Sequence, residues 1–167
     1  MRDRLRRAER GLAAAEGALL VALLAVMVTL AFAQVVLRHF GQGLLWGETV
    51  LKHLVLWTGF LGAALAAEAE KHFAWEAAHL GAPARLKPWL RLAGNAGGAA
   101  VCAFLLSAAW TYFLAERADG GTLFTAGALK VPSWIAAAGI PGGFALVLAH
   151  LSFKTADAAA ELAGAKP

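Results

Sequence analysis

The chain has 167 residues, of which 60% are hydrophobic and 16% are charged, and its mean hydropathy is +0.63. Soluble domains are about 45–50% apolar and about 25% charged, so this composition excludes an ordinary soluble domain. The net charge of +4 would suit a nucleic-acid-binding protein, but the basic residues lie between apolar blocks, which is typical of a membrane protein.

Four apolar blocks are long enough to cross a bilayer, since a transmembrane helix needs about 20 apolar residues. The predicted spans are residues 12–37, 49–67, 90–115 and 132–153. The expected fold class is therefore all-α integral membrane, with a single membrane domain over residues 1–167. The first block does not fit a cleaved signal peptide, because its apolar run exceeds the usual length of about 7–15 residues and no small-residue cleavage site follows it.

The segment before the first span is strongly basic. Arginines alternate with apolar residues over residues 2–11, which predicts an amphipathic helix on the membrane surface that bends into the span. The arginines are expected to contact anionic lipid headgroups. They are Arg2, Arg4, Arg6, Arg7 and Arg10.

The second span begins with charged residues and carries a tryptophan at depth. Glu48 and Lys52 are spaced four residues apart, in the order that favours an ion pair on a helix. Lys52 is expected to extend its ammonium group to the outer interface. Trp57 lies well inside the span, so we expect its indole to face another helix.

Small residues form two stripes along the same span. Gly59, Ala63 and Ala67 make one stripe, and Gly62 and Ala66 make the other. Such stripes let helix backbones approach closely in lipid, where no hydrophobic force drives helices together. The second span is therefore predicted to pack closely against a neighbouring helix.

Residues 69–80 read as an interfacial amphipathic helix, with His72 on its polar face. Trp75 and Trp89 are expected at the same depth, since indoles favour the membrane interface. His72, Glu76 and His79 have a spacing that could present three metal ligands on one helix face. Because no fourth ligand is evident, we interpret them as the water-facing side of this helix, and no metal is expected.

The third and fourth spans contain helix-packing and helix-bending signals. Gly94 and Gly98 form a GxxxG pair, which favours close helix contact in membranes. Cys102, the single cysteine, is interpreted as packing material because it has no partner for a disulfide. Pro132 suits a helix start. Pro141, with the two glycines that follow it, predicts a bend in the fourth span.

The distribution of basic residues predicts the orientation in the membrane. Eleven of the 15 Lys and Arg residues fall on the side that holds both termini and the connection between the second and third spans. Cytoplasmic loops of membrane proteins carry the excess of Lys and Arg. Both termini are therefore expected in the cytoplasm.

Catalytic motifs are missing from the sequence, and no carboxylate is expected inside a span. A self-sufficient proton-coupled exporter would need such an acid. His39 and His53 have a spacing that suits paired haem ligands, but a glycine-rich turn separates them. His53 and His150 lie near span ends rather than at mid-depth. Neither an enzyme nor a haem site is expected.

Several features along the chain form an ordered set. They are Arg38 and Phe40 at the end of the first span, Trp46, Glu48, Lys52 and Trp57, FLGAA at 60–64, His72 and Glu76, Pro132 and Trp134, and IPGGF at 140–144. Their order and spacing resemble the small membrane (Q-type) subunit of tripartite ATP-independent periplasmic (TRAP) transporters over nearly the whole chain. Thr49 stands where that family usually has a second glutamate, which leaves Glu48 as its substitute, and Glu76 stands where aspartate is usual.

The resemblance implies a sodium symporter of the bacterial inner membrane that imports organic acid anions. A periplasmic binding protein captures the substrate, and a large membrane subunit carries it. The small subunit braces the large one without binding substrate. No cofactor is then expected in this chain, and sodium ions are expected in the large subunit.

The surface expected to contact the large subunit lies at the start and along one face of the second span. Its residues are Arg38, Trp46, Glu48, Lys52, Trp57, Gly59, Gly62, Ala63 and Ala66. Two alternatives stay open from the sequence: a membrane anchor subunit of a haem or redox enzyme, and a stand-alone small transporter.

Overall fold

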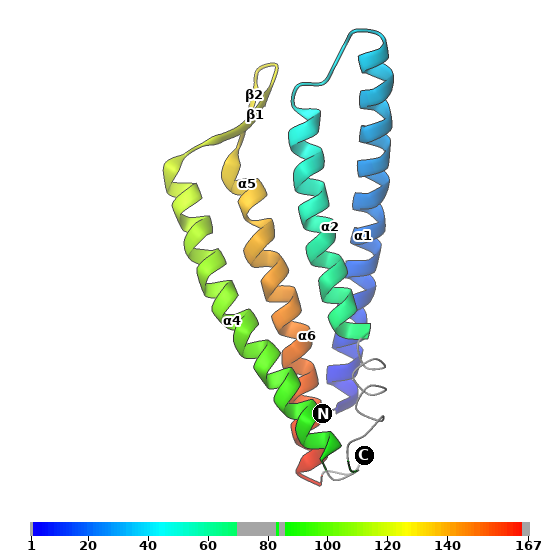
Figure 1. The fold of residues 1–167 in the computed structure, drawn as a ribbon, viewed down its shortest axis with the longest axis vertical. Helices are drawn as coiled ribbons and strands as arrows, with labels where there is room; N and C mark the ends of the chain where they lie inside the picture. The colour runs from blue at the N-terminus through cyan, green and yellow to red at the C-terminus, as the bar shows by residue number, and fades with distance from the viewer. Residues whose placement is uncertain (1, 70–82, 84–85, 165–167) are drawn as a thin grey trace.

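The computed structural model describes residues 2–69, 83 and 86–164, with side chains described over 11–67, 83 and 86–164. It is mostly helical (Figure 1). The elements are α1 (Arg2–His39), α2 (Gly47–Ala69), α4 (Lys87–Asp119), β1 (Thr122–Ala126), β2 (Leu129–Pro132), α5 (Ser133–Ala137) and α6 (Gly139–Leu162).

Within the described residues, four stretches of helix are long and apolar enough to cross a membrane, as the sequence predicted. They are Gly11–His39, Gly47–Ala67, Lys87–Asp119 and Ser133–Leu162. α1 and α2 lie side by side, and α4 lies beside α6 (Figure 1). The first turn of α1 and the last turn of α6 lie at the same end of the bundle, which we call the termini end. The opposite end, with β1 and β2, is the hairpin end.

α1 is one continuous helix of 38 residues, without a break where the sequence led us to expect a surface helix bending into the first span. At about 1.5 Å per residue it is about 57 Å long, well beyond a hydrocarbon core of about 30 Å. The helix therefore extends past the hydrocarbon whichever part of it spans. The surface position of residues 2–11 stays a prediction, and residues 70–80 of the second interfacial helix lie outside the described residues.

A short antiparallel hairpin connects α4 to α5, which the all-α expectation did not include. Gly120 ends α4 in the left-handed conformation (φ 65°), the usual helix stop. Ala126 pairs with Leu129, so the turn between the strands has two residues. Its first residue, Gly127, has a φ of 61°, which glycine adopts at low cost.

The break between α5 and α6 falls at Ala138, earlier than the bend predicted from Pro141. Pro132 does stand at the start of a helix, as expected, because it is the N-cap of α5. Pro141 lies in the first turn of α6, where a backbone N–H has no partner within the helix. The first turn of α6 therefore accommodates the proline without a bend.

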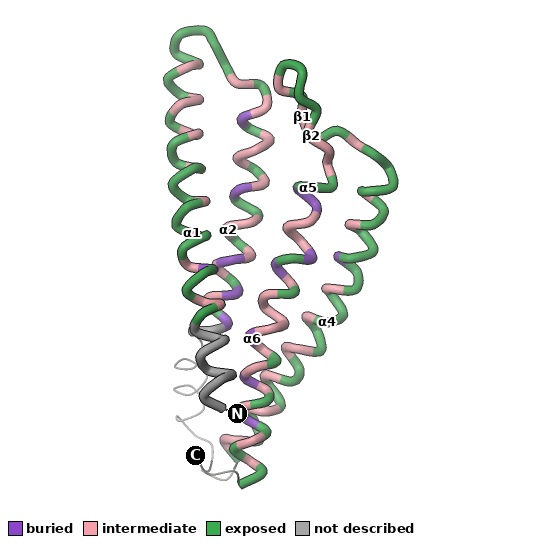
Figure 2. The backbone as a smooth tube through the Cα atoms, turned by 180° about the vertical axis from the view of Figure 1, so that it is seen from behind, coloured by how far each residue is buried: buried purple, intermediate pink, exposed green. Residues whose placement is uncertain are grey.

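Burial in the isolated chain concentrates where α2, α5 and α6 face each other (Figure 2). On α2, Leu54, Leu61, Ala64 and Ala67 are buried and lie on one face. α1 is exposed along most of its length. Large apolar side chains on its surface are expected in a protein whose solvent is lipid.

Candidate functional site

The pair α1 and α2 meets the pair α4 and α6 mainly through contacts between α2 and α6. We call these contacts, together with those that Glu16 of α1 and Ala136 of α5 make beside them, the seam. The seam determines whether the four long helices behave as one block or as two hairpins. Its residues are Glu16 on α1, Trp57, Phe60 and Ala67 on α2, Ala136 on α5, and Gly139, Gly143, Phe144, His150 and Lys154 on α6.

The middle of the seam is built from two aromatic rings against two glycines. A Cβ at Gly139 would collide with the indole of Trp57, and a Cβ at Gly143 would collide with the ring of Phe60. Trp57 Nε1 donates a hydrogen bond of 3.3 Å to the carbonyl oxygen of Ala136. That carbonyl belongs to the short helix α5 and Gly139 belongs to α6, so the indole contacts both sides of the break at Ala138. The expectation that Trp57 faces another helix is confirmed, and the helix belongs to this chain.

The termini end of the seam is polar and deeply buried. Glu16 is 4% exposed, His150 is 0% exposed and Lys154 is 8% exposed. His150 Nε2 lies 3.0 Å and 3.2 Å from the two carboxylate oxygens of Glu16. Lys154 Nζ donates to the carbonyl oxygen of Ala67, near the C-terminal end of α2, where a positive charge is favourable.

This polar cluster corrects two expectations. Glu16 lies within the first candidate span, although no carboxylate was expected inside a span. Lys154, one residue beyond the predicted fourth span of 132–153, is buried inside α6, which continues to Leu162. The sequence signal was faint: a glutamate at the edge of one apolar run and a histidine inside another, which only the fold brings together.

At the hairpin end, a second aromatic contact joins the start of α2 to β1. Trp46 stacks on Phe124 of β1, with ring centroids 5.9 Å apart and an interplanar angle of 22°. α1 and α2 also approach closely at this end, since a Cβ at Gly47 would collide with the side-chain amide of Gln34 on α1. These contacts place Trp46 within the chain's own packing, while its expected role at a partner stays a prediction.

A small polar pocket of about 140 Å³ lies between α1 and the start of α2. It is lined by Gln34, Arg38, Gly43, Leu44, Leu45 and Glu48. Lys52 also forms an ion pair with Glu48, with Nζ 3.0 Å from Oε1, which confirms the predicted pairing along the helix. Both side chains are largely exposed, so this pair adds little to stability. Three of the expected partner-contact residues, Arg38, Glu48 and Lys52, thus lie together at the hairpin end.

The small residues of α2 divide between two faces. Gly59, Ala63 and Ala66 are exposed, and a Cβ at Gly59 would meet no atom within 4 Å. Gly62 is half-buried and also has open space around it. Ala67, which we placed in the same stripe as Gly59, is buried on the seam side. Most of the predicted packing stripe is therefore left uncovered by this chain.

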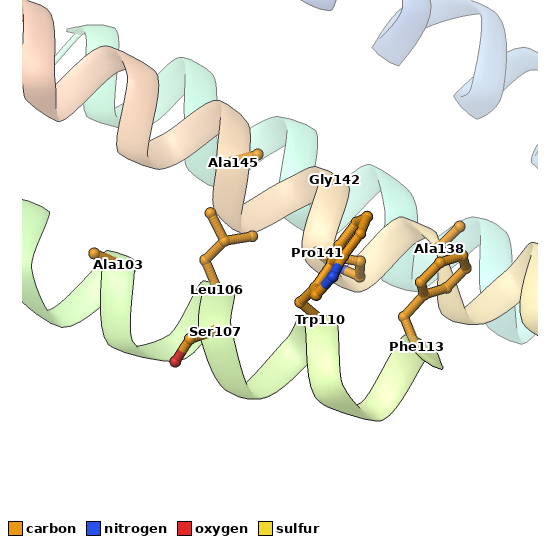
Figure 3. A pocket seen from close by; sticks show the side chains of 9 residues that line it. All are labelled: Ala103, Leu106, Ser107, Trp110, Phe113, Ala138, Pro141, Gly142 and Ala145. Carbon is orange, nitrogen blue, oxygen red and sulfur yellow. The ribbon is translucent and has the colours of Figure 1, made fainter. Parts of the chain in front are cut away.

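A groove of about 670 Å³ separates α4 from α6 near the hairpin end (Figure 3). Leu106, Trp110 and Phe113 project from α4 toward α6 in this view. Farther toward the termini end the two helices approach more closely, since a Cβ at Gly98 would lie 3.3 Å from Leu151. Gly98 thus confirms one half of the GxxxG prediction, whereas a Cβ at Gly94 would meet no atom within 4 Å.

The residues expected at the lipid interface are only partly described. Trp89 is 59% exposed near the start of α4, and its position at the membrane interface stays a prediction. The side chains of the five N-terminal arginines, together with His72 and Trp75, lie outside the described part of the chain. The metal-ligand spacing of His72, Glu76 and His79 also falls there. Among the described residues, no group of three or more His, Cys, Asp or Glu could hold a metal.

Two of the three histidines considered as haem ligands have hydrogen-bond partners within the chain. His53 Nδ1 lies 2.7 Å from the carbonyl oxygen of Thr49, and His150 Nε2 is engaged by Glu16. The mid-span hydroxyls are likewise used locally. Thr58 donates to the carbonyl of Val55 at 2.9 Å, and Ser107 to that of Phe104 at 2.7 Å. These geometries do not favour the haem-anchor alternative.

Comparison with known protein families gives a match. The model of a family described as "Tripartite ATP-independent periplasmic transporters, DctQ component" matches residues 26–160, most of the chain. A search of curated proteins finds no match. The matched stretch includes the aromatic part of the seam, the exposed face of α2 and the groove, but Glu16 lies before it.

Proposed function

Because the chain belongs to the DctQ component family of the tripartite ATP-independent periplasmic transporters, we propose that it is the scaffold subunit of a sodium-coupled importer of organic acid anions. It is a multi-pass membrane protein and a component of a transporter, in a family whose transporters also include a large membrane subunit and a periplasmic binding protein. The proposed role is to brace the large subunit without contacting the substrate.

The observation that carries the bracing role is the division of α2 into one face packed against this chain and one open face. Its inner face, with Leu54, Leu61 and Ala64, is buried against the rest of the chain. Its outer face presents Gly59, Ala63 and Ala66 without cover. In lipid, helices associate through close backbone approach at small residues. This face is therefore suited to a helix of the large subunit, with the seam holding α2 in place behind it.

The polar side chains near mid-depth support a subunit that lies outside the ion path. The hydroxyl hydrogens of Thr58 and Ser107 are donated to carbonyls of their own helices. Transporters commonly bind anions and sodium at interrupted helices near the bilayer centre. The one interruption in the described spans, at Ala138, lies close to the hairpin end, and Trp57 occupies it.

The distribution of charge supports the proposed orientation, and the family supports the proposed location in the bacterial inner membrane. With the termini end in the cytoplasm, the basic first turns of α1 lie at the inner leaflet, whose anionic lipids attract basic segments. The hairpin end, with Arg38, Lys52 and Lys130, then faces the periplasm of the bacterial inner membrane. Sodium ions belong to the large subunit in this proposal, and this chain holds no cofactor.

Co-purification with the large subunit tests the bracing face. The double variant Ala63→Leu/Ala66→Leu adds bulk where the close approach is proposed, so the yield of complex should fall several-fold. Ala100→Leu is the matched control, because Ala100 is an exposed alanine on α4. Equal yields of complex for the double variant and the control would rule out this face of α2 as the contact.

A further inference from the structure

The groove between α4 and α6 belongs neither to the seam nor to the bracing face on α2. On α4 it is lined by large side chains, among them Leu106, Trp110 and Phe113, and the facing part of α6 is mostly small residues (Figure 3). Gly142 lies in this lining, and a Cβ there would meet no atom within 4 Å. The two helices therefore leave a space of about 670 Å³ that neither of them fills.

The shape of the groove indicates what can occupy it. It follows α4 from Ala103 to Phe113, a length of about 15 Å at about 1.5 Å per residue. Dividing the volume by this length gives a mean cross-section of about 45 Å², about half that of an α-helix about 10–12 Å across. Both helices belong to candidate membrane spans, so the groove opens to lipid. An acyl chain is thin and flexible enough to follow it, and recovers the dispersion contacts that an empty space forfeits.

Aromatic side chains indicate the depth of the groove in the membrane. At its hairpin end, the ring of Phe113 lies 5.5 Å from that of Trp110 and 6.4 Å from that of Trp134, measured between centroids. The two indoles are 54% and 38% exposed. Indoles favour the level of the lipid headgroups. A phospholipid whose acyl chain follows the groove therefore has its headgroup beside the last turns of α4.

The last turns of α4 carry charges of both signs. Arg117 is exposed and lies four residues beyond Phe113, on the same face of the helix and at the mouth of the groove. It has no ion-pair partner among the described residues. Glu116 and Asp119 lie together near Gly121, where a Cβ would be 3.6 Å and 3.7 Å from their carboxylate oxygens. In the described part of the chain, no basic side chain pairs with either carboxylate.

We propose that the groove and the last turns of α4 bind one molecule of phosphatidylethanolamine. One acyl chain occupies the groove, the phosphate pairs with Arg117, and the ammonium group donates to the carboxylates of Glu116 and Asp119. A guanidinium group matches the geometry of a phosphate, and an ammonium group carries three donors. The inference depends on the membrane location alone, so it can be tested on this chain without the large subunit.

The headgroup determines which lipid is held. Lipid tails are as apolar as the groove, so an acyl chain by itself gives little preference for one phospholipid over another. Between Trp110 and Ala138 the chain carries two acidic and two basic residues. Because these charges sum to zero, a headgroup with one positive and one negative group is favoured over an anionic one.

Native mass spectrometry of the full chain, released from mixed micelles, tests the choice of lipid. Phosphatidylethanolamine, phosphatidylcholine and phosphatidylglycerol with identical acyl chains are titrated separately. One phosphatidylethanolamine should be retained per chain, at a half-saturating concentration about tenfold below that of the other two, the value of a charge-assisted hydrogen bond. Phosphatidylcholine has no ammonium hydrogen to donate, and phosphatidylglycerol has no ammonium group. Equal retention of the three lipids would overturn the proposal.

Two pairs of variants assign the site to the groove. Gly142→Leu fills the groove and should abolish retention of the single lipid, whereas Gly97→Leu, at an exposed glycine of α4 with open space around it, should not. Arg117→Gln should raise the half-saturating concentration about tenfold. Arg38→Gln removes an exposed arginine at the same end of the bundle, on α1, and should leave it unchanged.

The carboxylates and the rival occupant are tested in the same way. Glu116→Gln/Asp119→Asn should raise the half-saturating concentration of phosphatidylethanolamine to that of phosphatidylcholine. The other candidate for the groove is a helix of the large subunit. If Gly142→Leu lowers the yield of complex with that subunit several-fold and leaves lipid retention unchanged, the groove is a protein contact and the proposal is wrong.

Fluorescence quenching keeps the test decisive even if Gly142→Leu does not fold. Phosphatidylethanolamine brominated on an acyl chain should quench the parent chain in a step that saturates at one lipid per chain. The step should shrink in Trp110→Phe and persist in Trp89→Phe, because Trp89 lies at the other end of α4. Quenching that rises in proportion to lipid without a step would show only solvating lipid and contradict the proposal.

Discussion

Gly142 and Gly143 are adjacent in α6 but meet opposite surroundings. A Cβ at Gly143 would overlap the Cβ and ring atoms of Phe60, whereas a Cβ at Gly142 would meet no atom within 4 Å. Phe60 cannot rotate its own Cβ away, so α2 must move outward to admit Gly143→Ala. Gly142→Ala adds its methyl group to the open groove between α4 and α6.

The expected difference in stability follows from the structure. Both substitutions gain the same helix-forming advantage, about 0.5–1 kcal/mol for Ala over Gly. Only Gly143→Ala also carries the cost of overpacking, about 1–3 kcal/mol. Because the helix term is common to both, Gly143→Ala should be less stable than Gly142→Ala by about 1–3 kcal/mol.

Reversible unfolding of the purified chain in mixed micelles, followed by tryptophan fluorescence, measures both free energies. Gly142→Ala should be as stable as the parent chain or more so, and Gly143→Ala should be less stable. Trp57 emission should also change in Gly143→Ala alone, since the shift of α2 disturbs its contact with Ala136. Equal free energies of unfolding for the two variants would refute the close packing of Phe60 on Gly143.

Two further predictions concern the hairpin end and the orientation. In a cysteine-free background, Gly43→Cys and Ala128→Cys should react with an impermeant thiol reagent on intact cells, and Ala163→Cys should not; the reverse pattern would invert the topology. Trp46→Ala should lower the free energy of unfolding by about 0.5–1.5 kcal/mol beyond the lost buried area and make the hairpin more sensitive to protease. Unchanged proteolysis would mean that the stack on Phe124 does not hold the hairpin.

The number of spans and the family could be predicted from the sequence because both depend on local patterns. Apolar length alone predicts four crossings, and the four helices are present. The ion pair of Glu48 with Lys52 follows from helical spacing and was found as expected. The position of Trp57 inside an apolar run also indicated a contact with another helix.

The remaining features depend on pairs that are distant in the sequence. Glu16 and His150 are each unremarkable in their own segments, and only the packing of α1 on α6 joins them. The hairpin was missed because its strands are short and its turn signal, Gly127, lacks the usual neighbouring Asn or Asp. The break at Ala138 was misplaced because Pro141 indicates a bend only in a helix interior, and it lies in a first turn.

Radiolabelled organic-anion uptake into proteoliposomes, titrated with sodium, tests the central claim that this chain braces the transporter without forming its binding site. The complex is compared with the large subunit and the binding protein alone, and with complexes carrying Thr58→Val, Asn95→Leu or Ser107→Ala. Uptake should be lost without this chain, while the three variants should keep the sodium half-saturation and the substrate affinity of the parent complex. A several-fold shift in the sodium half-saturation for any of the three would place the ion path in this subunit and contradict the account.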